Sequence, residues 1–309
     1  MSNIRIIEEG GELVYPEALP PETEERVHLD LTNTQLELYY ESVDLLKGSD
    51  FTLIRRDGFG GSDSSYLCNV NPYDCLANII DQKARKTLTE EERAVSNQIA
   101  VIKGNDLEPL IIKKFEQIMG IKCWKPTDMY RFKDFPYLKM NFDGVTGKPE
   151  QYFPVEIKVV TKRGERHYNA ALAYYTSQRG FGLVPPNHSI TDNSIETKAA
   201  LYGIPPYYYT QLQDEMMALN APYGYLCTLW ESSWTVHMYF IWRDPKTQSA
   251  IVLNGSKAWD KVLALREQRG LPAQLFNIGV SNDDDTQIRK THARRARALS
   301  KLRTPSRAL

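Results

Sequence analysis

The sequence has 309 residues, of which 42% are hydrophobic and 25% are charged, and its formal net charge at pH 7 is −1. These values are ordinary for a globular protein and exclude a collagen-like or low-complexity chain. The four cysteines lack a Cys-x-x-Cys pair, which argues against a zinc ribbon, an iron–sulfur cluster or a disulfide framework. No secretion signal and no run of about 18 apolar residues is found, so we expect a reduced, cytoplasmic environment without membrane contact.

Charge is unevenly distributed along the chain. Residues 1–50 hold twelve acidic and three basic residues, whereas residues 286–309 hold eight basic residues and no acidic one. A basic tail commonly binds nucleic acid or an acidic partner, and a solvated, disordered tail is an equal alternative. We therefore predict an acidic N-terminal extension with a helix (1–50), a main domain (51–285) and a basic, flexible C-terminal tail (286–309).

The first part of the chain is predicted to be mainly helical. A helix is expected over 33–48, ending at Gly48. The glycine-rich stretch RRDGFGGSDSS, 55–65, is predicted to be a turn that leads into a short helix. Further helices are expected over 71–84 and within 88–120, where the apolar residues recur at helical spacing.

Strands are predicted to dominate the second part. Short strands are expected within 130–144, followed across the turn TGKPEQ by a strand over 153–160 that would lie next to the last of them. A long loop is expected within 161–205, then a helix over 205–220 and two strands within 223–243 that close the compact part. This order of helices and strands predicts an α/β fold with a central mixed sheet flanked by helices.

Two charged residues interrupt the apolar segment FPVEIKVV, 153–160. Glu156 and Lys158 would project from the same face, because side chains alternate between the faces of a strand. Asp143 ends the preceding segment, before Gly144, and would approach Glu156 from an adjacent strand. Paired carboxylates indicate a site for a hard cation such as Mg²⁺, beside which Lys158 would neutralise charge or orient water. A surface ion pair without function is the alternative.

A third carboxylate, Glu108, falls in the apolar arc of a helix that is expected to begin near Asn105 or Asp106. A charge that faces the core needs a partner, and a metal shared with the two strand acids would supply one. Ordinary capping of the helix end is the alternative interpretation.

The glycine-rich stretch combines Arg55, Arg56 and Ser62 just before a predicted helix. Guanidinium groups and backbone N–H groups at a helix start form a site for phosphate, although a plain glycine turn would look the same. The tyrosines at 207–209 and His167 are expected to pack in the core or a loop rather than to contact DNA.

Five segments, taken in order, resemble the phage lambda-type exonucleases, also called the YqaJ-like viral recombinase family of the PD-(D/E)XK nuclease superfamily. They span about residues 55–245 and are RRDGFGGSDSSYLCNVNPY, KGNDLEPLIIKKFEQIMG, FPYLKMNFDGV, VEIKVV and YYYTQLQDEMMALNAPYGYLC. The resemblance implies a restriction-endonuclease-like core.

The resemblance also implies catalytic roles for residues at matching positions. Glu108, Asp143, Glu156 and the backbone carbonyl of Ile157 would hold two Mg²⁺ ions, with Mn²⁺ as a substitute. Lys158 would position or activate the attacking water. Two metals of this kind would stabilise the attacking and leaving oxygens of a phosphodiester.

The substrate contacts are implied in the same way. Arg55 and Ser62 would hold the 5′-phosphate of the recessed strand, and the spacing to Ser62 favours Arg55 over Arg56. Asn141 stands where some relatives have a serine that contacts phosphate. Gln213, or else Gln211, would be the glutamine on the helix after the catalytic strand.

The predicted activity is therefore that of a Mg²⁺-dependent 5′→3′ exonuclease. It would degrade one strand of linear double-stranded DNA and leave a 3′ overhang for a phage single-strand-annealing protein. The resemblance implies a homo-oligomer, a trimer in the family. The alternatives are a structure-selective or restriction-like endonuclease, and a non-catalytic DNA- or protein-binding module.

Overall fold

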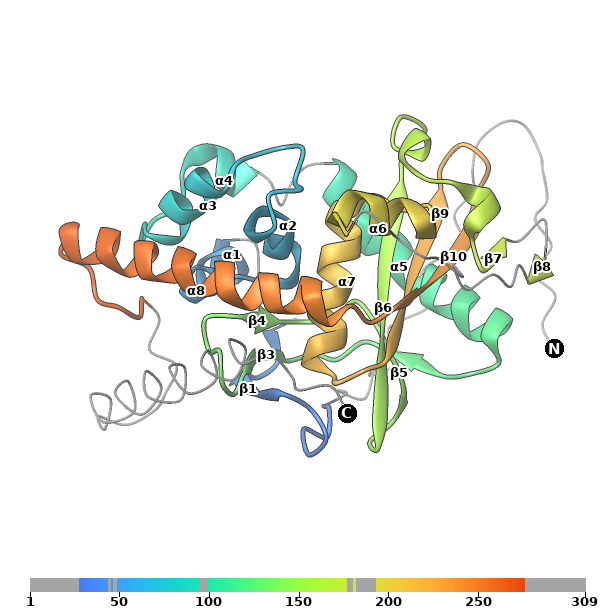
Figure 1. The fold of residues 1–309 in the computed structure, drawn as a ribbon, viewed down its shortest axis with the longest axis horizontal. Helices are drawn as coiled ribbons and strands as arrows, with labels where there is room; N and C mark the ends of the chain where they lie inside the picture. The colour runs from blue at the N-terminus through green and yellow to red at the C-terminus, as the bar shows by residue number, and fades with distance from the viewer. Residues whose placement is uncertain are drawn as a thin grey trace.

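The structure is a computed structural model that describes residues 28–43, 46, 49–94, 99–176, 180–181 and 193–275. It contains a seven-stranded sheet with the strand order β2-β5-β6-β9-β10-β7-β8, and a three-stranded sheet with the order β1-β3-β4 (Figure 1). The large sheet consists of β2 (Cys123–Trp124), β5 (Val145–Lys148), β6 (Gln151–Val160), β7 (Tyr175–Thr176), β8 (Gly180–Phe181), β9 (Tyr223–Trp230) and β10 (Thr235–Trp242). The small sheet consists of β1 (Leu36–Tyr40), β3 (Met129–Phe132) and β4 (Lys139–Met140).

The helices fall into two groups along the chain. Those before the large sheet are α1 (Ser49–Ile54), α2 (Ser64–Leu67), α3 (Leu76–Lys83), α4 (Glu90–Ala94) and α5 (Ile99–Met119). The later ones are α6 (Ile195–Tyr202), α7 (Pro206–Ala218) and α8 (Pro245–Gln268). Short 3₁₀ turns at Arg55–Asp57 and Gly61–Asp63 join α1 to α2.

Helices cover both faces of the large sheet. Strand β6 pairs antiparallel with β5 and parallel with β9, so the sheet is mixed. Val155 and Ile157 of β6 pack in one core cluster with Ile111 and Phe115 of α5. On the other face, α7 packs through apolar residues that include Leu212 against β9. Figure 1 shows α7 to the left of β6 and α5 passing behind the strands to the right. The predicted α/β fold with a mixed sheet flanked by helices is confirmed.

The helix predicted over 33–48 is wrong for its central residues. Leu36–Tyr40 form strand β1, which pairs antiparallel with β3 and places Leu36 opposite Phe132. Leu36 and Leu29 belong to the main hydrophobic core. Pairing with a distant strand therefore overrides the local helical pattern, and this part of the predicted extension is built into the fold.

Two further elements differ from the prediction. The short strands predicted within 130–144 are β3 and β4, but they pair with each other in the small sheet instead of lying beside β6. Helix α5 begins at Ile99 and runs through Pro109, so Asn105 and Asp106 lie inside the helix rather than at its start.

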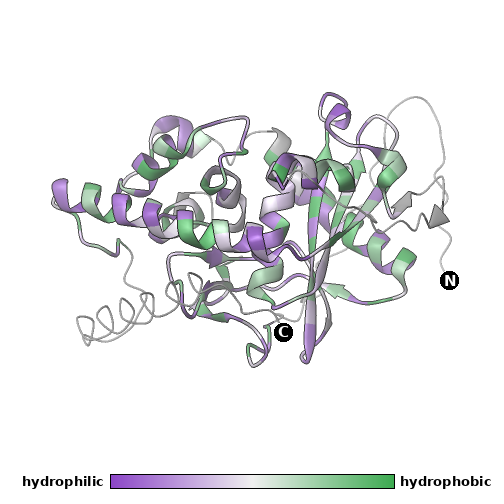
Figure 2. Ribbon diagram, viewed as in Figure 1, coloured by the Kyte–Doolittle hydropathy of each residue, from purple (hydrophilic) through white to green (hydrophobic). Residues whose placement is uncertain are grey.

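Helix α8 was not predicted, although the sequence carries its signals. Asp244 caps the N-terminus by accepting a hydrogen bond from the backbone of Lys246, and Pro245 occupies the first turn. Its buried residues include Ile251, Val252, Ala258 and Val262, and Figure 2 shows hydrophobic and hydrophilic residues alternating along it. Helix α8 packs against α2, α3 and α7.

The chain ends, with the acidic residues 1–27 and the basic tail 286–309, lie outside the described residues, as do residues 177–179 and 182–192 of the segment 161–205 in which a long loop was expected. The described part of that segment includes β7, β8 and α6, which were not predicted. No described helix is long and apolar enough to cross a membrane.

Candidate active site

Glu156 and Lys158 share one face of β6, as the alternation of the strand predicted. Their neighbours Val155 and Ile157 pack on the opposite face, toward α5. Glu156 is 1% exposed, and the ammonium of Lys158 forms an ion pair with its carboxylate. The same ammonium lies 3.3 Å from Oδ2 of Asp143. One lysine is therefore shared by two acids.

Asp143 reaches this pair by a route different from the predicted hairpin. It lies two residues before β5, the antiparallel neighbour of β6, whereas β4 belongs to the small sheet. The backbone N–H of Ile157 donates a hydrogen bond of 3.1 Å to Asp143 Oδ2. Gly144 is needed for this approach, since a Cβ there would lie 2.8 Å from Sγ of Cys123. Backbone contacts thus fix the aspartate beside β6.

Glu108 lies well inside α5 and does not cap it. Its side chain is largely buried, and Oε1 forms an ion pair of 2.5 Å with Nζ of Lys125. Burial, followed by repulsion from Asp143, raises the pKa of Glu108. The third predicted carboxylate is therefore within electrostatic reach of the strand acids.

Helix α7 adds two residues, one of which sequence reasoning missed. Gln211 Nε2 donates to Glu156 Oε1 at 2.6 Å and to Glu215 Oε1 at 3.2 Å. Glu215, which is 1% exposed, was not predicted, yet its spacing of four residues from Gln211 places both on one helix face. Gln213 is a correction: it is fully buried and faces away, donating to the carbonyl of Trp242 and accepting from the N–H of Asp244.

The acid cluster, which we define as Glu108, Asp143, Glu156 and Glu215, is electrostatically strained. Burial, together with repulsion from Asp143, raises the pKa of Glu156 to about 7. Burial and the charge of Glu156 raise the pKa of Glu215 well above its usual range. For Asp143 burial acts in the same direction, but Lys158 and the N–H of Ile157 outweigh it and lower the pKa. Additional positive charge would stabilise the cluster.

The donor set fits a hard divalent cation. Among the described residues, no three His, Cys, Asp or Glu side chains stand ready to share a metal ion, and Lys125 and Lys158 pair with the carboxylates instead. The available donors are nevertheless carboxylate oxygens in a buried, mutually repelling group. Mg²⁺ is bound in proteins through one or two such carboxylates together with substrate phosphates.

A pocket of about 510 Å³ is lined by Gln211, whose side chain donates to Glu156 of the acid cluster. Arg55 and Ser62 also line it, and Arg55 Nη2 donates a hydrogen bond of 2.8 Å to Ser62 Oγ. Gly60 allows the guanidinium to pack on the backbone, because a Cβ there would lie 2.7 Å from Arg55 Nη2. The glycines of this stretch therefore permit close approach.

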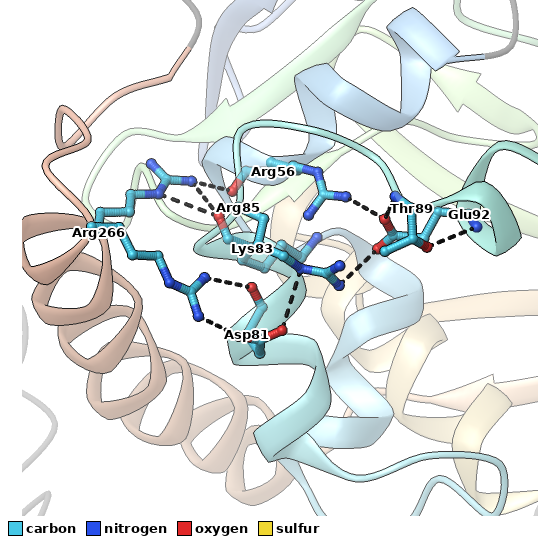
Figure 3. Close-up of polar contacts among 8 residues, drawn as sticks. Arg56, Asp81, Lys83, Arg85, Thr89, Glu92 and Arg266 are labelled. Carbon is cyan, nitrogen blue, oxygen red and sulfur yellow. Dashed lines mark hydrogen bonds and ion pairs between the residues drawn. The ribbon is translucent and has the colours of Figure 1, made fainter.

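Arg56 pairs with Glu92 and not with Ser62. It is 3% exposed, and its Nη2 forms an ion pair of 2.8 Å with Oε2 of Glu92, which also contacts Arg85 and Thr89. Figure 3 shows Arg56 and Arg85 converging on Glu92 from two sides. Of the two arginines, Arg55 is the one with a side chain beside Ser62.

Arg266, near the end of α8, anchors the backbone of this stretch. It is 0% exposed and forms an ion pair of 2.9 Å with Asp57. It also donates to the carbonyls of Arg56, Lys83 and Ala273, and Figure 3 shows its guanidinium pointing at the first two. We call Arg266 and these partners the arginine network. It ties α8 to the segment that carries Arg55.

One predicted residue, Asn141, and one residue that was not predicted, Lys83, have clear positions near the site. Asn141 lies two residues before Asp143 and is half-buried. Lys83 donates to the carbonyl of Arg55 and pairs with Asp63 at 2.7 Å, while Asp63 accepts from the N–H of Gly60. These contacts hold in place the backbone of the segment that carries Arg55 and Ser62.

Buried carboxylates and a lysine on a mixed sheet, next to an arginine-lined pocket, are typical of the class of α/β proteins that act on phosphate esters with a divalent cation. The chain belongs to the family described as "YqaJ-like viral recombinase domain", which it matches over residues 50–221, more than half of its length. The resemblance found in the sequence is confirmed at the level of this family.

Solved structures with a similar fold include the alkaline exonuclease LHK-Exo from Laribacter hongkongensis. In complex with dAMP it is 15% identical, with a TM-score of 0.46, covering 70% of this chain and 92% of that chain. A phage-related exonuclease from Haemophilus somnus 129PT is 13% identical, with a TM-score of 0.40, covering 69% of this chain and 96% of that chain. No curated protein matches the sequence.

Proposed function

We propose that the chain is a Mg²⁺-dependent exonuclease that degrades one strand of linear double-stranded DNA in the 5′→3′ direction. The observation that carries this proposal is the buried acid cluster with Lys158 between Asp143 and Glu156. Membership of the viral recombinase family and the adjacent pocket with Arg55 and Ser62 support it.

Each residue has a distinct part in the proposed reaction. Glu108, Asp143, Glu156 and the carbonyl of Ile157 would hold Mg²⁺, for which Mn²⁺ would substitute. When bound, the cation would neutralise the charge that develops on the phosphoryl oxygens. Lys158 would position the attacking water, and Gln211 would orient the carboxylate of Glu156 through the hydrogen bond between them. Gln211 takes the place that the sequence had assigned to Gln213.

The pocket accounts for the proposed preference for an end. Arg55 and Ser62 would hold a terminal 5′-phosphate, since guanidinium and hydroxyl groups donate strong hydrogen bonds to phosphate oxygens. Asn141 is a further proposed phosphate contact. With the terminal phosphate held beside the acid cluster, hydrolysis would release mononucleotides and leave a 3′ overhang.

The biological setting is also a proposal. The overhang would serve homologous recombination by a phage single-strand-annealing protein, inside a bacterial host that carries the phage or prophage. A homo-oligomer, a trimer in the family, would encircle or grip the duplex. The basic residues 286–309 would add salt-sensitive affinity for DNA or for the annealing protein.

The test uses linear duplex with and without a 5′-phosphate, and a covalently closed circle, each with Mg²⁺. We expect the wild-type protein to degrade the phosphorylated linear duplex and to leave the circle intact. Glu156→Gln and Lys158→Ala should each lower the rate by about 10²- to 10³-fold, since each removes a group from the charge-stabilising site. Glu150→Gln, in the exposed turn between β5 and β6, is the matched control.

Two outcomes would count against the proposal. Cleavage of the closed circle at a comparable rate would indicate an endonuclease on the same fold. Equal degradation by the wild type, Glu156→Gln and Lys158→Ala would reject the acid cluster as the site of the chemistry.

A further inference from the structure

Tyrosine rings border the pocket that contains Arg55 and Ser62. Tyr73, Tyr207 and Tyr208 all line it. Tyr73 is 75% exposed, more than any other large hydrophobic side chain exposed among the described residues. Of the tyrosines at 207–209, which were expected to pack in the core or a loop, Tyr209 does so and is 2% exposed. Core packing does not explain the exposed ring of Tyr73 beside the pocket.

The exposed ring belongs to a series of packed aromatic contacts. The rings of Tyr73 and Tyr207 lie 5.8 Å apart at 64°, and those of Tyr207 and Tyr208 lie 4.5 Å apart at 61°. Behind them, Tyr208 stacks on Tyr168, which contacts Trp230. Edge-to-face pairs of this kind are favourable arrangements of aromatic rings. The rim of the pocket is therefore supported from within.

Hydrogen bonds fix Tyr73 relative to the proposed phosphate contact. The backbone N–H of Tyr73 donates to Asn71 Oδ1 at 2.9 Å, and Asn71 Nδ2 donates to Ser65 Oγ at 2.8 Å. Ser65 Oγ in turn donates to the carbonyl of Ser62 at 3.0 Å. The turn that carries the ring is thus coupled to the residue beside Arg55.

Helix α7 connects the same rings to the acid cluster. Tyr207 and Gln211 are one helical turn apart, and Gln211 donates to Glu156. The ring of Tyr208 lies 5.6 Å from Nζ of Lys158. Aromatic rings and the Arg55–Ser62 pair therefore line one pocket of about 510 Å³, within the size range of small-molecule sites, and Gln211 in its wall donates to the carboxylate of Glu156.

We propose that Tyr73 and Tyr207 form a stacking platform for the base of the 5′-terminal nucleotide, so that the pocket binds this nucleotide by its base as well as by its phosphate. This inference rests on the proposed function and adds the nucleobase as a recognised group. Every base has a π-face, so an aromatic platform tolerates any sequence, as degradation of DNA regardless of sequence requires. From typical stacking energies, the base should improve KM by about 5- to 100-fold.

The test compares two 5′-phosphorylated duplexes that differ only at the first nucleotide, which is either intact or abasic. We expect the wild type to show a KM about 5- to 100-fold lower for the intact duplex. Tyr73→Ala should raise the KM for the intact duplex to that for the abasic one, and should leave the KM for the abasic duplex and both kcat values unchanged. Tyr73→Phe, which keeps the ring, should behave as the wild type.

A control and a binding measurement separate this inference from the proposed function. Trp234→Ala removes another exposed aromatic side chain, one that does not line the pocket, and should change neither KM. Fluorescence of 2-aminopurine at the first position of a 5′-phosphorylated strand should be quenched by the wild type and less by Tyr73→Ala. Quenching that depends on Tyr73 without any degradation would retain the platform and reject the exonuclease.

Two results would overturn the platform. One is degradation of both duplexes with the same KM by the wild type. The other is an equal rise in KM for the intact and abasic duplexes in Tyr73→Ala, which would make Tyr73 a general structural residue rather than a contact of the base.

Discussion

The acid cluster around Glu156 and the arginine network around Arg266 are both buried and charged, yet their charges are balanced in opposite ways. Arg266 donates to one carboxylate and to three backbone carbonyls, so the hydrogen-bonding groups of its guanidinium are used. In the acid cluster, burial and then repulsion between the carboxylates raise the pKa of Glu108, Glu156 and Glu215, and few cations are shared among them. A satisfied network stabilises a fold, whereas an unsatisfied cluster marks a place where a ligand would supply what is missing.

The largest expected effect on stability tests the arginine network. Arg266→Met should lower the free energy of unfolding by about 3–5 kcal/mol, because it leaves the carboxylate of Asp57 buried without its cation. The matched control is Arg269→Met, three residues further along the chain, where an ion pair with Asp81 is partly exposed and should contribute below about 1 kcal/mol. Urea unfolding of both variants measures the difference. Similar losses of unfolding free energy in the two variants would show that the arginine network contributes no more to stability than the exposed ion pair of Arg269.

In the acid cluster, removing a charge should raise the free energy of unfolding instead of lowering it. At pH 8, without metal, Glu156→Gln should raise the free energy of unfolding by about 2–3 kcal/mol, since the pKa of about 7 in the folded state exceeds the ordinary glutamate pKa of 4.5. Between these two values the folded state holds more protons than the unfolded state, so wild-type stability falls as pH rises. Below pH 4.5 both states are protonated and the gain should vanish.

Unfolding curves at pH 4.5 and pH 8, recorded with a chelator, measure this reversal. A destabilising effect of Glu156→Gln at pH 8 would mean that the ion pair with Lys158 outweighs burial and repulsion. The charges of the acid cluster would then stabilise the fold, as those of the arginine network do, and the contrast between the two regions would be wrong.

A smaller effect separates two glutamines on one helix. Gln213→Ala should lower the free energy of unfolding by about 1–3 kcal/mol, because the carbonyl of Trp242 and the N–H of Asp244 lose their partner, and it should leave activity on DNA intact. Gln211→Ala should leave stability nearly unchanged and reduce activity, because the carboxylate of Glu156 loses its orienting donor. Activity loss in Gln213→Ala alone would restore the assignment made from the sequence.

These two glutamines show where sequence reasoning reached its limit. Positions 211 and 213 differ by about 200° around a helix, so only one can face the acid cluster. Both flanks of α7 are buried, by the sheet on one side and by α8 on the other. Polarity along the helix therefore does not reveal which face meets the site.

Local patterns were sufficient elsewhere. Alternation along β6 predicted that Glu156 and Lys158 share a face, whereas β5 was missed because its residues 146–148 belong to the stretch TGKPEQ that was taken as a turn. Strand β1 was missed because its register with β3, about 90 residues away, decides its conformation. Glu215 was missed because its position beside Glu156 depends on how α7 packs against β6, although its spacing from Gln211 on the same helix is visible in the sequence.

The sequence by itself determined most of the periodic elements, the family and the residue types that could serve phosphate chemistry, because these depend largely on neighbours within a few positions. The tertiary structure alone decided which acids share Lys158, which glutamine reaches them and how α8 fixes the segment of Arg55. Those outcomes depend on contacts between segments far apart in the chain, whose energies exist only once the chain has folded.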